Sequence, residues 1–384
     1  MVNQFAAATI RWRWLIIIAS IITVFLIARG AANIGFSSNY RVFFSEDNEQ
    51  LVAFEALQNT YSKSDNIIFV LHPKDEQVFT HTMLAAVKDL TERSWQLPYS
   101  TRVDSITNYQ HTWAEEDDLV VEDLILELDV IDQQLVERTQ AISTVEPNLV
   151  HSLVSPDGKV AVVNITIQLP DKENNTAEVI QVTEFAKQLT DSFAEKYQSA
   201  DFYHTGVILM NYSFATEGQK DMMKLVPSMF LMIIIMLTVL LRSFTGMLMT
   251  VIVIFLTITA TMGTGGWFGY FLSTGTINVP IVVMTLAVAD CVHLVASTQF
   301  AMRQGKSRKE AVEFAMDLNL MPVFITSATT AIGFLTLMFS ESPVLADFGE
   351  MSAMGVMIAF FLSVPLLPAP MVIIPTPAQA APAH

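Results

Sequence analysis

The chain has 384 residues, of which 52% are hydrophobic and 15% charged, and its formal net charge is −17. So acidic a chain does not suit nucleic-acid binding, which requires a basic surface. The single cysteine excludes a disulfide within one chain, so any exported part must be held by its own core. Charged residues crowd between about residues 41 and 224. This distribution predicts a membrane protein with one large soluble insertion.

The first apolar run lies near the N-terminus. Residues 14–28 are apolar, and Arg11 and Arg13 precede them. A signal peptide begins in the same way, but no convincing small-residue cleavage site follows Arg29. We therefore expect residues 1–30 to hold a cytoplasmic N-terminus and a retained first transmembrane helix, with the arginines keeping its start in the cytoplasm.

Residues 31–223 are polar and alternate between strand-like and helix-like patterns. We expect strands at 66–71, 103–107, 163–169 and 201–207, and helices at 79–95 and 182–193. An acidic stretch that ends near residue 141, interpreted as a loop followed by a helix, is inserted after the second strand. The order strand, helix, strand, strand, helix, strand predicts an α+β domain of the ferredoxin-like type. We expect this domain to be extracytoplasmic, because the helix before it leaves the cytoplasm.

This domain carries no catalytic or metal-binding motif. Its histidines are scattered without metal-ligand spacing. Neither a GxSxG motif nor a phosphate-binding loop occurs in the sequence. We therefore predict that the chain is not an enzyme and binds neither a metal nor a cofactor.

Five further apolar runs follow within residues 224–376, and a short tail at 377–384 ends the chain. The runs are 225–241, 247–271, 277–298, 321–339 and 351–374, the last interrupted by prolines. The loop after the fourth run is the most basic short loop, so it belongs in the cytoplasm. The predicted fold is therefore an α-helical polytopic membrane protein with six transmembrane helices, both termini cytoplasmic, and the α+β domain between helices 1 and 2.

Glycines gather near the end of the third run. A dinucleotide-binding motif is disfavoured there, because no strand precedes the glycines and their surroundings are apolar. Gly265 and Gly269 instead have the GxxxG spacing with which transmembrane helices pack closely. We predict that these two glycines form a helix-packing face.

The fourth run carries one acid, Asp290, near its middle. A charged side chain at the centre of a transmembrane helix costs roughly 2.5–3.5 kcal/mol, so such an acid is a candidate functional group. His293 lies three residues on and shares its helical face. In the fifth run, Thr329 and Thr330 either bond back to helix carbonyls or face Asp290 across the bundle. The predicted proton relay is Asp290, His293, Thr329 and Thr330, although His293 equally suits a neutral, packed role.

Six stretches carry a resemblance to a known family. They are LAVADCVHL (286–294), GKSRKEAVEFAM (305–316), PVFITSATTAIGFLTLMFSESP (322–343), FGEMSAMGV (348–356), LSVPLLPAP (362–370) and, in the soluble insertion, LVSPDGKVAVVNITIQLP (153–170). Together with the succession of spans, they resemble one half of a resistance–nodulation–division (RND) permease. The nearest branch is the MMPL-like exporters, which are related to proteins with a sterol-sensing domain (SSD).

The resemblance implies a secondary active transporter in the inner cell membrane. It would use proton antiport to export a lipid or another hydrophobic or amphipathic substrate, and its soluble insertion would be a porter-type domain. The family's fourth-span acid corresponds to Asp290, whereas Leu286 stands where the family commonly has glycine and Cys291 where an aromatic residue often follows. Membrane lipids would be further partners.

Family members usually join two such halves, whereas this chain has six predicted spans. It would therefore form a homo-oligomer, pair with a second RND half, or represent a truncated frame. Two other function classes stay open. One is a non-pumping, sterol-sensing-like module that binds lipid, and the other is an accessory subunit of protein translocation.

Overall fold

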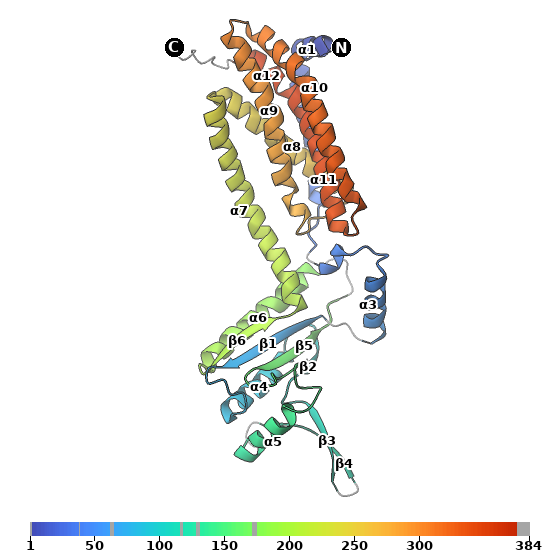
Figure 1. Ribbon diagram of the computed structural model, residues 1–384, viewed down its shortest axis with the longest axis vertical. Helices are drawn as coiled ribbons and strands as arrows, with labels where there is room; N and C mark the ends of the chain where they lie inside the picture. Colours follow the sequence, from blue (N-terminus) through green and yellow to red (C-terminus); the bar gives the residue numbers. More distant parts are fainter. Residues whose placement is uncertain are drawn as a thin grey trace. The chain divides into compact units, whose positions relative to one another are not determined.

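The computed structural model describes residues 2–37, 39–61, 65–115, 118–127, 131–170 and 175–374 (Figure 1). Contacts divide the chain into two compact units. Unit 1 comprises Met1–Glu46 and Ala215–His384, and unit 2 comprises Asp47–Phe214. The limits at residues 31 and 223 stay predictions, and the predicted tail at 377–384 lies outside the described residues.

Unit 2 is built on a four-stranded sheet with the order β2-β5-β1-β6. Its strands are β1 (Asn66–Pro73), β2 (Ser100–Asp104), β5 (Ala161–Ile167) and β6 (Ala200–Thr205). Helix α4 (His81–Ser94) follows β1, and α6 (Thr176–Lys196) follows β5. β1 pairs antiparallel with β5 and with β6, and β2 pairs antiparallel with β5. These elements overlap the six segments expected from the sequence.

The core of unit 2 follows from alternation along the two central strands. In β1 and β5 every second residue is buried, because successive side chains of a strand point to opposite faces. Phe69 and Ile165 are 1% and 0% exposed, and they belong to one core with Leu84 of α4 and Phe193 of α6. The two helices therefore bury their apolar faces with the apolar face of this sheet.

The acidic insertion after β2 differs from the expectation. Where a loop was expected, β3 (Gln110–Glu115) and β4 (Asp118–Asp123) form a two-stranded antiparallel sheet, followed by α5 (Gln133–Ser143). The Arg138 guanidinium lies 4.6 Å from the ring centroid of Trp113 and so ties α5 to β3. The strands were missed from the sequence because the acidic residues at their ends are typical of a loop and obscure the short apolar pattern between them. Unit 2 also contains an unexpected helix, α3 (Glu49–Thr60).

Unit 1 contains the long apolar helices. They are α2 (Arg13–Ala28), α7 (Val207–Leu241), α8 (Phe244–Trp267), α9 (Val279–Arg303), α10 (Arg308–Leu335) and α11 (Pro343–Leu366), of which α7 begins in unit 2. Short segments flank them: α1 (Val2–Arg11), η1 (Arg29–Asn33), η2 (Tyr40–Phe43), η4 (Thr276–Asn278), η5 (Thr336–Phe339) and α12 (Pro368–Ile373). Within the described residues, six helical segments are long and apolar enough to cross a membrane. The prediction of a polytopic membrane protein with six candidate spans is confirmed.

Burial separates the central helices of unit 1 from the outer ones. α9 contacts α8, α10 and α11, and much of its surface is buried. By contrast, α2 and α7 expose large apolar side chains such as Phe25 (64%) and Leu231 (60%). Such faces suit hydrocarbon rather than water as the solvent. In Figure 1, α9 and α11 run side by side in the bundle.

Candidate functional site

Asp290 lies near the middle of the 25-residue helix α9 and is 7% exposed. It shares the buried side of α9 with Ala287, Cys291 and Leu294, which are all apolar and packed in the bundle. The fold therefore places a carboxyl group among hydrocarbon side chains. Such a group needs a partner or water before it can carry a charge at reasonable cost.

A hydroxyl from the neighbouring helix meets this carboxyl group. Ser327 on α10 is 3% exposed, and its hydroxyl lies beside the Asp290 carboxyl group. Its position follows from a stripe of buried residues spaced four apart on α10, namely Asn319, Val323, Ser327 and Ala331. Residues four apart share one helical face, so this stripe is the side of α10 that packs in the bundle.

A pocket of about 310 Å³ opens beside Asp290. Its walls come from α9 and α10 and consist of Ala289, Asp290, His293, Leu318, Asn319, Pro322, Val323 and Thr326. Four of these side chains bear polar atoms, and a cavity needs only about 10–15 Å³ of probe-occupied volume to hold a water molecule. The pocket is therefore large and polar enough to hydrate the Asp290 carboxyl group.

Asn319 is held in a fixed orientation in this pocket. Its amide nitrogen donates to the Ser297 hydroxyl oxygen and to the Ala315 carbonyl oxygen, both at 2.8 Å. Both amide hydrogens are thereby used, so the Asn319 Oδ1 atom is left to accept from water. Pro322 adds a second acceptor, because a proline has no N–H and deprives the Leu318 carbonyl of its helical donor.

The predicted relay residues fall at different places around the pocket. His293 is exposed and lines the pocket together with Asp290. The Thr329 hydroxyl is also exposed and donates back to the carbonyl of Ile325 at 2.8 Å. Thr330 is half-buried, and neither threonine is among the residues that line the pocket. The structure thus brings His293 to Asp290 and brings neither threonine to the pocket.

Two polar residues of this site were missed from the sequence. Ser327 and Asn319 carry the polar groups on the buried stripe of α10, eight residues apart. Thr329, two positions beyond Ser327, is rotated by about 200° around the helix axis. The four-residue spacing of Asn319, Val323, Ser327 and Ala331 was the signal that would have selected the correct face.

The two glycines of the predicted packing pair, Gly265 and Gly269, have different surroundings. Gly265 is buried in α8, and a Cβ atom there would come within 2.7 Å of the Met351 side chain. Gly269 lies after the end of α8, where an added Cβ would meet no atom within 4 Å. Two further glycines of α8, Gly263 and Gly266, touch the last turn of α2 and the η1 segment after it, respectively. A Cβ on either would collide with the backbone of Ile27 or Gly30.

The side chains that line the pocket supply carboxyl, imidazole, amide and hydroxyl groups. In the part of the chain that the structure describes, no group of three or more His, Cys, Asp and Glu side chains could hold a metal ion.

Comparison with known proteins places the chain in a family. The model of the MMPL family matches residues 43–383. A protein of Methanocaldococcus jannaschii, named as a membrane protein, is 30% identical over 117 residues. That match covers 30% of this chain and 30% of the archaeal protein. Because the family model matches most of the chain, this protein belongs to the MMPL family.

Proposed function

We propose that this chain is a proton-motive-force-driven exporter of the RND/MMPL type, with Asp290 as the group that takes up and releases the proton. The substrate class is a lipid or another hydrophobic or amphipathic molecule. The observation that carries the proposal is the buried Asp290 carboxyl group in the middle of α9, beside a pocket to which four polar side chains contribute.

The mechanism rests on the cost of charge in hydrocarbon. When water fills the pocket, the ionised form of Asp290 is solvated. When α9 and α10 close the pocket, the charge becomes costly and the neutral acid is favoured. A bundle that alternates between these arrangements couples proton movement to a conformational change. The membrane potential supplies about 2.3 kcal/mol per charge for each 100 mV.

Each neighbour has its own part in this proposal. His293 lines the pocket, and an imidazole both accepts and donates protons, so it would pass the proton between Asp290 and water. Ser327 would hold the carboxyl group by a hydrogen bond. Thr330 lies one helical turn from Ser327 and would extend the polar path. The Thr329 hydroxyl is already bonded to its own helix and contributes least.

We further propose that unit 2 is a ferredoxin-like, porter-type domain outside the cytoplasm. The strand order β2-β5-β1-β6, with all pairs antiparallel and helices after β1 and β5, supports this assignment. Basic residues before α2 and between α9 and α10 favour a cytoplasmic location for those ends. The proposed location is the inner membrane, with both termini in the cytoplasm and a homo-oligomer or second RND half as partner.

The decisive experiment replaces Asp290 by asparagine. Proteoliposomes with an imposed pH gradient would contain pyranine to report protons, while an NBD-labelled phospholipid quenched by dithionite would report lipid movement. We expect the wild type to move protons and lipid together. Asp290→Asn should reduce both to the level of protein-free vesicles, because the amide cannot exchange the proton.

The matched control is Asp317→Asn, which changes an exposed acid on α10. This variant should behave like the wild type, and size-exclusion profiles should show that both variants are folded. Lipid movement by Asp290→Asn at the wild-type rate would contradict the proposal. If lipid movement by Asp290→Asn were also independent of the pH gradient, the result would favour the alternative function, a non-pumping module that binds lipid.

A further inference from the structure

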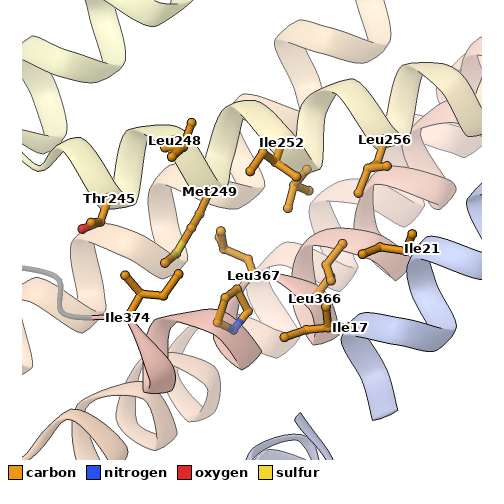
Figure 2. Close-up of a pocket in the computed structure, with 12 residues that line it drawn as sticks. Ile17, Ile21, Thr245, Leu248, Met249, Ile252, Leu256, Leu366, Leu367 and Ile374 are labelled. Atoms are coloured by element: carbon orange, nitrogen blue, oxygen red, sulfur yellow. The ribbon is translucent and has the colours of Figure 1, made fainter. Parts of the chain in front are cut away.

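A second pocket lies in unit 1, between α2, α8 and the end of α11 with α12. Its volume is about 250 Å³. In Figure 2, Met249 and Leu248 of α8 lie on one side and Leu366 and Leu367 on the other, while Ile21 of α2 lies at one end. None of the proposed relay residues lines it.

The lining of this pocket excludes water as its natural filling. Apart from Thr245, the residues that line it are apolar, and apolar cavities stay dry because water finds no hydrogen-bonding partner in them. Pockets that hold drug-sized ligands measure roughly 300–1,000 Å³, so this pocket is too small for a whole lipid. Part of one flexible hydrocarbon chain suits both its size and its chemistry.

Two tryptophans mark the depth of the pocket in the membrane. Trp12 and Trp14 are 54% and 59% exposed at the start of α2, and exposed tryptophans of membrane helices gather at headgroup level. Ile17, which lines the pocket, lies four residues after Arg13. At 1.5 Å per residue, the pocket begins about 6 Å beyond the arginine. This is the depth at which acyl chains meet their headgroups.

Arginine side chains surround the same end of the helices. Arg13 shares a helical face with Ile17, and its Nε atom is buried without a hydrogen-bond partner among the described residues. Its Nη1 atom donates to the Ile10 carbonyl at 3.3 Å. Arg11 lies two residues before Arg13, and Arg242 lies two residues before α8 begins. A phosphate is the group that a guanidinium fork binds with two parallel hydrogen bonds.

We propose that this pocket holds part of one acyl chain of an anionic phospholipid from the leaflet in which α2 begins, with the lipid phosphate on Arg13. The lipid is a bound component of the bundle that stabilises the packing of α2, α8 and α12. It is distinct from the exported substrate, so the assignment does not rest on the proposed transport mechanism.

Native mass spectrometry of the purified full-length chain tests this assignment. The chain is equilibrated in micelles that contain equal amounts of palmitoyl-oleoyl phosphatidylglycerol and phosphatidylcholine. Both lipids carry a phosphate, but the choline ammonium of phosphatidylcholine already offsets the phosphate charge that Arg13 would bind, whereas phosphatidylglycerol keeps its net negative charge. We therefore expect the wild type to retain one phosphatidylglycerol with about tenfold preference, the ratio that one charge-assisted interaction gives. Arg13→Gln should retain a lipid but reduce this preference to near parity.

Filling the pocket should remove the lipid. Leu256→Trp adds bulk to the α8 wall, and Ile21→Trp adds it from α2. Either variant is enough to test the proposal if the other is misfolded. Phe255→Trp is the matched control, because Phe255 directly precedes Leu256 on α8, is 61% exposed and does not line the pocket. The proposal is overturned if the wild type retains no lipid, or if the filled variants retain it as the control does. An unchanged headgroup preference in Arg13→Gln would overturn the assignment of the phosphate to that arginine.

Discussion

Asp89 in unit 2 and Asp290 in unit 1 are both poorly exposed carboxyl groups on helices, but their partners differ. The Asp89 side chain is 14% exposed and lies 2.8 Å from Arg93 Nε and 2.7 Å from Lys196 Nζ. Asp290 is 7% exposed, and its neighbour on α10 is the neutral hydroxyl of Ser327. No ion pair involving Asp290 is seen among the described residues.

This contrast separates a structural acid from a candidate functional one. Burial opposes the ionisation of Asp89, but hydrogen bonds from Lys196 and Arg93 outweigh it and hold the pKa of Asp89 below its usual value. Asp89 therefore stays ionised and fastens α4 to α6. No such cation lies beside Asp290 among the described residues, so in the proposed mechanism its ionisation depends on the water that reaches its pocket. The partners of a buried carboxyl group identify its role better than its burial does.

The largest expected effect comes from giving Asp290 a cation of the kind that Asp89 has. Ser327→Lys would place an ammonium group beside the carboxyl group and hold it as an ion pair. We expect proton-coupled lipid movement in proteoliposomes to stop completely, because the fixed charge no longer exchanges its proton. Ser327→Met has similar length without charge and should retain measurable transport. Near-normal transport by Ser327→Lys would contradict the claim that Asp290, unlike Asp89, must lack a cationic partner to function.

A smaller effect is expected from making the Asp290 pocket less polar. Asn319→Leu removes the amide that Ser297 and the Ala315 carbonyl hold in place. Transport should fall about threefold to tenfold, which corresponds to the net loss of about one hydrogen bond to water in the pocket. Asn319→Ser keeps a polar group and should lose less activity in the same assay. Equal rates for the leucine variant and the wild type would remove Asn319 from the site.

Asp89 is the structural acid of the pair, so Asp89→Asn should lower the free energy of unfolding of unit 2. It should leave transport per folded chain unchanged. The loss of two charge-assisted contacts to a mostly buried carboxylate should cost about 1–2 kcal/mol of unfolding free energy. Hydrogen exchange of peptides from α4 and α6 would measure it. Asp104→Asn breaks the exposed pair with Arg102 and should cost less than about 0.5 kcal/mol.

The effect of Asp89→Asn on the stability of unit 2 should depend on pH. A carboxyl group whose pKa is lowered by folding stabilises the folded state above its unfolded pKa of about 3.9, and this contribution is lost as pH falls through the folded value. The stability difference between wild type and Asp89→Asn should therefore be full at neutral pH. It should shrink in acid below about pH 4. A difference that grew on acidification would show that Asp89 is not held as an ion.

Much of the fold was visible in the sequence where one strong pattern acts alone. The six apolar runs are long enough to span hydrocarbon, and the alternation in β5 specifies one buried face. The α7 helix begins at Val207 rather than near residue 225, because nothing in its polar first part stops a helix after the turn at Gly206 (φ 124°). The β3–β4 pair was hidden because its acids are typical of a solvated loop.

The candidate site was only partly predictable for a related reason. Asp290 stands out because an isolated acid in an apolar run is costly to place in hydrocarbon, which makes its position a candidate functional site. The choice among Thr326, Ser327, Thr329 and Thr330 depends on the rotation of α10, and a run of similar hydroxyl residues carries little information about that rotation. The rotation of α10 is determined by its packing against α9 and α11, which exists only in the assembled bundle and cannot be read from the α10 sequence alone.

The contact of Gly30 with Gly263 and Gly266 has a mechanical consequence. Backbone meets backbone there without intervening side chains, and the Trp267 indole donates to the Ile27 carbonyl at 3.1 Å. Helices joined in this way have no compressible layer between them, so α2 and α8 should behave as one stationary frame during a transport cycle. In the proposed mechanism, the movement that opens and closes the Asp290 pocket would then lie between α9 and α10, whose side chains form its walls.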